Sequence, residues 1–247
     1  MPMRPHPIPT LLVLLFLSPL LRAEDEPPEV ETDPKVVEAK LERILEEYDA
    51  IRASQDLVPT RRRRELARRL GYLQHEKACR TLLRIVEDDP DMRARIEAMY
   101  SLARIGDFDD IRRLYKIALK EARRTVLEDY FALAMAQATA PEVGPWLVDQ
   151  VLKTSLDNLQ LGVVEALGAL RTVEARPELL VLLERETRKT NRDMHLYYEV
   201  LRALGRIGGD EVRPVLHGAA AETDWRPRLA VAEVLLQAFA DDESIEL

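Results

Sequence analysis

The feature that most constrains the fold of this 247-residue chain is a short pattern that recurs along most of its length. A large apolar residue stands before a small residue in most copies, and successive copies are 32, 33, 32, 37 and 32 residues apart. Such a period is typical of solenoids, in which each repeat stacks on its neighbours to bury its apolar face. These large residues, here called the anchors, are Leu70, Leu102, Met135, Leu167, Leu204 and Leu236.

The anchor, the residue four positions before it and the residue three positions after it are apolar in every copy, although only 47% of the whole chain is hydrophobic. Spacings of −4, 0 and +3 place these residues on one face of a helix, so we expect them to be buried. The residue after the anchor is small in five of six copies, which lets a neighbouring helix approach closely. Four residues before the anchors stand Leu66, Ala98, Phe131, Val163, Val200 and Ala232, and three residues after stand Leu73, Ile105, Ala138, Leu170, Ile207 and Phe239.

A second motif follows three of the anchors at a fixed distance. It reads Glu-x-x-Pro-x-Leu and occurs at residues 142–147, 174–179 and 211–216. Proline is tolerated in the first turn of a helix, and an acidic residue there suits the positive end of the helix dipole. The motif therefore predicts the start of a second helix, so each repeat is a helix A, a short turn and a helix B.

These columns and the Glu-x-x-Pro motif resemble the HEAT-repeat family, in the short bacterial form that is also found in phycobilin lyases. The resemblance covers roughly residues 60–247. It implies an all-α fold, a right-handed α-solenoid of about five to six helix-pair repeats. In such stacks the B helices line a concave groove, so the resemblance also implies where a partner would bind.

The region before the repeats is expected to have three parts. Residues 1–23 read as a signal peptide, with Arg4 before an apolar run and Ala23 at the cleavage site. The alternative is an uncleaved anchor, but about eleven apolar residues are too few, since a membrane span needs about 20. We therefore expect export to the periplasm or the extracellular space, with no membrane span after processing. Residues 24–32 form an acidic linker.

Residues 33–59 are predicted to hold an N-terminal capping helix, and residues 60–247 the HEAT-like repeat solenoid. Asp33 and Pro34 suit a helix start. The apolar residues of this helix follow steps of four and three, which is also the pattern of a coiled-coil seam. Two heptads are too few to establish a coiled coil, so a cap on the open end of the solenoid is favoured over a dimer seam. The apolar residues are Val37, Leu41, Ile44, Tyr48 and Ile51.

Charge and residue usage exclude several classes of function. After removal of residues 1–23 the chain has 34 basic and 44 acidic residues, which argues against nucleic-acid binding and against anionic membranes. The single cysteine, Cys79, cannot form an intramolecular disulfide, and its apolar neighbours indicate a buried residue. No zinc spacing, phosphate-binding loop or hydrolase serine motif occurs. We therefore expect no catalytic residue, no metal and no cofactor.

The candidate binding residues come from the predicted B helices of the first three repeats. Basic residues recur there, and they would make the groove basic in its N-terminal half, which favours an acidic segment of a protein partner. The candidates are Trp146, Lys116, Lys120, Lys153, Arg113 and Arg84. The arginine run at residues 61–64 opens repeat one. It could bind a phosphate or an acidic partner, but a solvated outer face of helix A is favoured.

Trp146 has two interpretations. It follows Pro145 in a column that holds Glu178 in the next repeat, so the column accepts a charged side chain and is not obligate core. A solvent-facing tryptophan is a typical anchor for a partner. The alternative is that Trp146 fills a gap against the neighbouring repeat.

The function predicted from the sequence is that of an exported, non-catalytic scaffold that binds a protein partner in its groove. The alternative is an accessory enzyme or chaperone-like protein that holds a ligand or cofactor there. After the last anchor only a short stretch follows, without a full helix B, so we expect an open end that recruits a cover.

Cleavage of the predicted signal peptide is testable directly. Since the apolar run ends at Pro19 and a small residue stands at Ala23, the mature chain should begin at Glu24. N-terminal sequencing of exported protein checks this. Recovery of chains that still begin with Met1 from a membrane fraction would contradict it.

Overall fold

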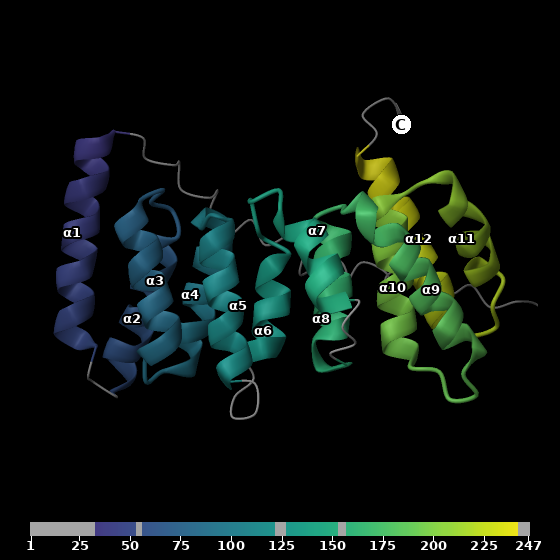
Figure 1. Ribbon diagram of the computed structural model, residues 1–247, viewed down its shortest axis with the longest axis horizontal. Helices are drawn as coiled ribbons and strands as arrows, with labels where there is room; N and C mark the ends of the chain where they lie inside the picture. Colours follow the sequence, from purple (N-terminus) through teal and green to yellow (C-terminus); the bar gives the residue numbers. More distant parts are fainter. Residues whose placement is uncertain (1–32, 53–55, 122–126, 153–156, 242–247) are drawn as a thin grey trace, which may run out of the picture. The chain divides into compact units, whose positions relative to one another are not determined.

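The computed structural model describes residues 33–52, 56–121, 127–152 and 157–241. The predicted signal peptide (1–23) and acidic linker (24–32) lie outside these residues. All regular elements in the described part of the chain are helical, and they follow one another in chain order (Figure 1). None of the described helices is long and apolar enough to span a membrane.

Two rows of helices make up the fold, as the repeat pattern predicts. Each helix of the first row, the A row, packs on the next one along the chain. The A row consists of α2 (Leu57–Leu70), α4 (Met92–Ile105), α6 (Leu127–Met135), α8 (Asp157–Ala169), α10 (Met194–Ile207) and α12 (Trp225–Asp241). The second row, the B row, consists of α3 (Glu76–Asp88), α5 (Phe108–Glu121), α7 (Val143–Leu147) with η1 (Val148–Leu152), α9 (Arg176–Arg188) and α11 (Arg213–Ala220). Each B-row helix packs against the A helix that follows it. The chain is an all-α solenoid.

Small residues set how closely successive A helices approach. A Cβ added at Gly168 of α8 would lie 2.7 Å from the Cα of Ala203 in α10. At Gly71 the added atom would lie 2.6 Å from the Cβ of Ser101 in α4. Because real Cβ atoms do not come this close, a larger residue at either position would push the helices apart. The small-residue column of the sequence is thus explained by helix contact.

The anchor column is confirmed in five repeats. The anchors from Leu70 to Leu204 are fully buried, and so are the residues four positions before them. The prediction is wrong for the last repeat, in which Leu236 is 63% exposed and Ala232 is also exposed.

The register of α12 also departs from the sequence columns, although the shift does not bury an anchor, since Leu235 is itself 49% exposed. In earlier repeats the residue that meets the preceding helix's glycine stands one position before the anchor, as Ala203 does. In α12 this place is taken by Val234, whose γ-methyl carbons lie 2.4 Å from a Cβ added at Gly205. The register is therefore one residue earlier than the sequence columns indicate. In the sequence, Leu235 and Leu236 each have apolar residues four positions before and three positions after, so either could be the anchor. The packing of Val234 on Gly205 selects Leu235.

The B row begins its helices where the motif predicts, and in repeat three the helix starts directly after Glu142. Pro177 and Pro214 stand in the first turns of α9 and α11, after the short 3-10 turns η2 (Val173–Ala175) and η3 (Asp210–Val212). In repeat three the α-helix α7 has only five residues and passes into the π-helical turn η1. Repeat three therefore has the most irregular B helix among the described repeats.

Helix α1 (Pro34–Ile51) packs on α2 and covers the first repeat. Asp33 caps its first turn by accepting a hydrogen bond from the backbone N–H of Lys35 at 2.9 Å. The stepped apolar face is the buried one, with Leu41 and Ile44 almost inaccessible to solvent. This face is occupied within the chain, as expected for a cap and not for a dimer seam.

A buried ionic network fastens this cap to the first two repeats. The guanidinium of Arg63 in α2 lies 3.2 Å from the carboxylate of Asp89, and both side chains are almost fully buried. Arg63 also donates to the carbonyl oxygen of Ile51 at the end of α1, at 3.1 Å. The Tyr48 hydroxyl of α1 donates to the same Asp89 carboxylate. Burial and that carboxylate raise the pKa of Tyr48, so it remains a donor at neutral pH.

The arginine run is therefore only partly a solvated face. Arg61 is exposed, whereas Arg63 is 1% exposed and pairs with an acid 26 residues later. The expectation of a solvated outer face is wrong at Arg63, because a buried guanidinium is tolerated where a carboxylate and a carbonyl satisfy it.

The two arginines provide a matched test of the network. Removing one partner of a buried ion pair leaves an uncompensated charge, so Arg63→Ala should lower the free energy of unfolding by about 3–5 kcal/mol. The neighbouring Arg61→Ala should change it by less than about 0.5 kcal/mol. Urea denaturation measures both. Equal stability of the two variants would mean that the network does not hold the cap.

Candidate functional site

The basic side chains predicted to form a stripe lie on the B row, but most of them are paired with acids. Arg84 of α3 lies 3.0 Å from Asp49 of α1, and Lys120 of α5 lies 3.5 Å from Glu87. Arg113 lies 3.5 Å from Asp110 within its own helix. These exposed pairs make the N-terminal half of the B row a mixed surface of alternating charge.

Two candidates remain outside these pairs. Lys116 is exposed on α5 and has no ion-pair partner among the described residues. Lys153 lies outside the described residues. The predicted stripe therefore contributes one unpaired cation to the described surface, at Lys116.

Trp146 is half-buried in a cluster of aromatic side chains. Its ring meets the ring of Tyr115 edge-on, with centroids 5.0 Å apart and planes at 89°. Phe108, also on α5, and Phe131 on α6 have ring centroids 6.0 Å and 6.4 Å from it in similar T-shaped geometry. Such arrangements are favourable because the positive edge of one ring meets the negative face of another. The contacts with Phe108 and Tyr115 join repeat three to repeat two and leave part of the Trp146 side chain exposed.

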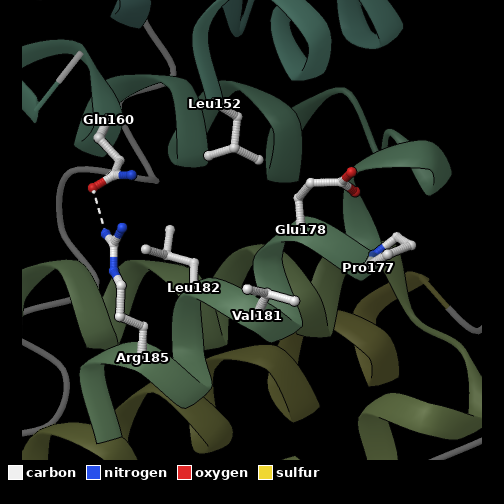
Figure 2. A pocket seen from close by; sticks show the side chains of 7 residues that line it. All are labelled: Leu152, Gln160, Pro177, Glu178, Val181, Leu182 and Arg185. Atoms are coloured by element: carbon white, nitrogen blue, oxygen red, sulfur yellow. Dashed lines mark hydrogen bonds between the residues drawn. The ribbon is translucent and has the colours of Figure 1, made fainter. Parts of the chain in front are cut away.

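A pocket opens further along the B row, between η1 and α9. Its volume is about 370 Å³. One face of α9 forms its floor, because residues at spacings of three and four share a helix face. Opposite lie Leu152 of η1 and Gln160 of α8 (Figure 2). The lining residues from α9 are Pro177, Glu178, Val181, Leu182 and Arg185.

The pocket has an apolar centre and two polar ends. Figure 2 shows Leu152, Val181 and Leu182 around the middle, with Glu178 at one end and Arg185 at the other. Arg185 donates a hydrogen bond to the side-chain oxygen of Gln160 at 3.3 Å. Val181 is 66% exposed, which is unusual for a large apolar side chain on a helix. The arrangement suits an apolar group flanked by polar groups of opposite charge.

The local backbone explains why the pocket exists. The α-helical part of helix B in repeat three ends at Leu147, and Leu152 belongs to the π-helical turn that follows. Helix α9, in contrast, runs for 13 residues. Among the described residues, part of the α9 face thus has no full neighbouring helix to cover it. π-helical turns are rare and occur frequently at functional sites.

Side chains that could carry other chemistry have structural roles here. His75 caps α3, since its Nδ1 accepts a hydrogen bond from the backbone N–H of Lys77 at 3.1 Å. Cys79 is buried, and burial together with the nearby Asp110 carboxylate raises the pKa of its thiol to about 12. No three or more His, Cys, Asp or Glu side chains in the described residues lie together as metal ligands would.

The comparison with protein families gives a match over part of this fold. Residues 59–134, which run from α2 to α6, match the model of HEAT repeats. This part of the chain carries HEAT repeats. The resemblance drawn from its anchors and small-residue column is thus confirmed, and HEAT repeats generally serve as protein-interaction scaffolds. None of the curated proteins matches the sequence.

Sequence reasoning did not find the pocket between η1 and α9. Its residues belong to different helices, and no column of the repeat shows that η1 departs from α-helical geometry. One signal was present, because Val181 is a large apolar residue on the outward side of α9, with the charged Glu178 and Arg185 one turn away on the same face. Such a residue is ambiguous in a single sequence.

The aromatic cluster leads to a test of Trp146. Removing a large ring that contacts three others should lower the free energy of unfolding, and we expect Trp146→Ala to cost about 2–4 kcal/mol. The exposed Val58→Ala in α2 serves as the control and should cost less than about 0.5 kcal/mol. Thermal and urea denaturation report both values. A Trp146→Ala protein as stable as its parent would mean that the ring does not join the repeats.

Proposed function

We propose that the chain is an exported, non-catalytic scaffold that binds a segment of a protein partner along the B row. The pocket between η1 and α9 is the principal contact in this proposal. HEAT repeats are generally interaction scaffolds, and solenoids bind partners on extended surfaces. The single observation that carries the proposal is the pocket's pattern of an apolar centre with a cation at one end and a carboxylate at the other.

This pattern selects the chemistry of the bound segment. Leu152, Val181 and Leu182 would take one large apolar side chain. The Arg185 guanidinium, whose side chain is about half exposed, would take a carboxylate, because charge-assisted hydrogen bonds from arginine to carboxylates are strong and directional. The preferred segment is therefore an apolar residue with Asp or Glu on one side.

The rest of the B row supplies the secondary contacts in this proposal. The exposed part of Trp146 lies in α7, which continues directly into η1 beside the pocket. Lys116 on α5 offers a cation to a second acidic residue of the segment. The acidic partner expected from the sequence is therefore recognised at Lys116 and at Arg185, which lies 3.6 Å from Glu186 but keeps about half of its side chain exposed inside the pocket lining.

A second function has one observation in its favour. A volume of about 370 Å³ lies within the range of small-molecule sites, so a ligand-holding protein of the accessory-enzyme or chaperone type would use the same pocket. Native mass spectrometry of the purified protein separates the two functions. A bound small molecule that disappears from the Val181→Glu variant would favour ligand holding.

The scaffold proposal is tested with peptides selected from a random library on the immobilised protein. We expect the selected peptides to share a large apolar residue next to Asp or Glu. Val181→Glu should weaken their binding by roughly tenfold or more, because it places a charge in the apolar centre. Isothermal titration calorimetry measures the affinities.

Two further variants make the test specific. Val58→Glu changes an equally exposed valine, 75% accessible, on α2 and should leave peptide affinity unchanged. Arg185→Glu should shift the preference from acidic to basic peptides, because it reverses the charge at one end of the pocket. Peptides that bind Val181→Glu as tightly as the parent protein would rule out this pocket as the binding site.

A further inference from the structure

The helix α12 has two apolar faces, of which only one is covered by other residues that the structure describes. Its buried face packs on α10 and α11 and consists of Pro227, Ala230, Val231 and Val234. On the opposite side four residues follow steps of four, three and four, and all four are exposed. They form the α12 stripe, which comprises Trp225, Leu229, Ala232 and Leu236. Three large apolar side chains in line on one helix face are unusual for a surface.

The α12 stripe occupies the same positions on α12 as the face with which α10 contacts the next A helix. The equivalent positions 31 residues earlier in α10 face α12. Gly205 there lies against Val234, and the Tyr198 hydroxyl donates to Glu233 at 2.7 Å. On α12 the corresponding positions are Leu236 and Leu229. The stripe is thus built to receive a helix, as every earlier A helix of the stack does.

We propose that the occupant is the α12 stripe of a second copy of this chain, packed antiparallel across a two-fold axis. In a two-fold interface the same patch must fit itself. With the axis between Leu229 and Ala232, each Leu229 meets the small Ala232 of the other copy, so large and small residues alternate. Each Trp225 then meets the other copy's Leu236.

The two ends of the stripe differ in shape in a way that suits this pairing. At the N-terminal end Trp225 and Leu229 border a cavity of about 220 Å³ between α12 and α10, which Met194 and Tyr198 also line. At the C-terminal end Leu235 and Leu236 project from the helix, 49% and 63% exposed. An antiparallel pair places the projecting leucines of each copy beside the cavity of the other.

Charge favours the antiparallel arrangement over a parallel one. Arg226 and Arg228 flank the N-terminal half of the stripe, and Glu233 flanks its C-terminal half. A parallel pair would set the arginines of both copies side by side, and like charges destabilise such a pair. An antiparallel pair brings Arg226, which lies 3.3 Å from Asp224 of its own chain, towards Glu233 of the other copy, which lies 3.0 Å from its own Arg202. Antiparallel helix dipoles also oppose each other favourably.

The test is the oligomeric state of the purified full chain, measured by sedimentation equilibrium over a range of micromolar concentrations. The expected result is a monomer–dimer equilibrium. Leu236→Asp should weaken the dimer by roughly tenfold or more, because it puts two charges into the seam. Val58→Asp, which changes an exposed valine on α2, should leave dimerisation unchanged. Circular dichroism melts confirm that both variants fold.

A cross-linking experiment tests the orientation. In the antiparallel pair residues 229 and 232 of opposite copies lie in one layer, so a mixture of Leu229→Cys and Ala232→Cys chains should form a disulfide-linked heterodimer on mild oxidation. Ala232→Cys alone should cross-link far less. Efficient cross-linking of that variant alone would overturn the antiparallel pair. A monomeric parent protein, or a dimer insensitive to Leu236→Asp, would overturn the proposal as a whole. The stripe and the pocket at Val181 consist of different residues. Peptide binding at the pocket is therefore measured independently of dimerisation, and either proposal can fail without the other.

Discussion

The close approach of successive A helices is the constraint on which the rest of the structure depends. At Gly71 and Gly168 the neighbouring helix comes so near that a Cβ has no room. This proximity brings the anchors under the B row and removes them from water, which is the main source of stability for a stack of this kind. Each repeat alone would leave its apolar face exposed. The glycine and alanine column thus does as much to define the fold as the large residues beside it.

Polar interactions decide how the stack is finished and how its surface is charged. At the N-terminal end the ion pair of Arg63 with Asp89 and the hydroxyl of Tyr48 hold α1 in one position. Along the B row many of the arginines and lysines face carboxylates of the same or a neighbouring helix. A net charge of −8 is therefore spread through local pairs, and Arg185, which lines the pocket, is itself 3.6 Å from Glu186.

The sequence predicts regular features of this fold well, because they repeat. Five anchors, the proline starts of α9 and α11 and the buried Cys79 follow from periodicity and residue type. Features that depend on one contact do not follow. The burial of Arg63 requires an acid 26 residues away. Which residue of α12 packs on Gly205, Val234 or Leu235, depends on the space that this glycine leaves. The pocket depends on a π-helical turn, for which the residues of η1 carry no recognisable pattern.

The irregular third repeat has a consequence for how the stack responds to force and to heat. Stability in a solenoid is nearly a sum of terms within repeats and between neighbours, so the weakest junction is where cooperativity breaks first. With five α-helical residues and one π-helical turn, helix B of repeat three contributes fewer regular hydrogen bonds than α5 or α9. The repeats on either side can then open as separate cooperative units, visible as two groups of amide-exchange rates. A molecule bound across η1 and α9 would join these units and slow the exchange of both.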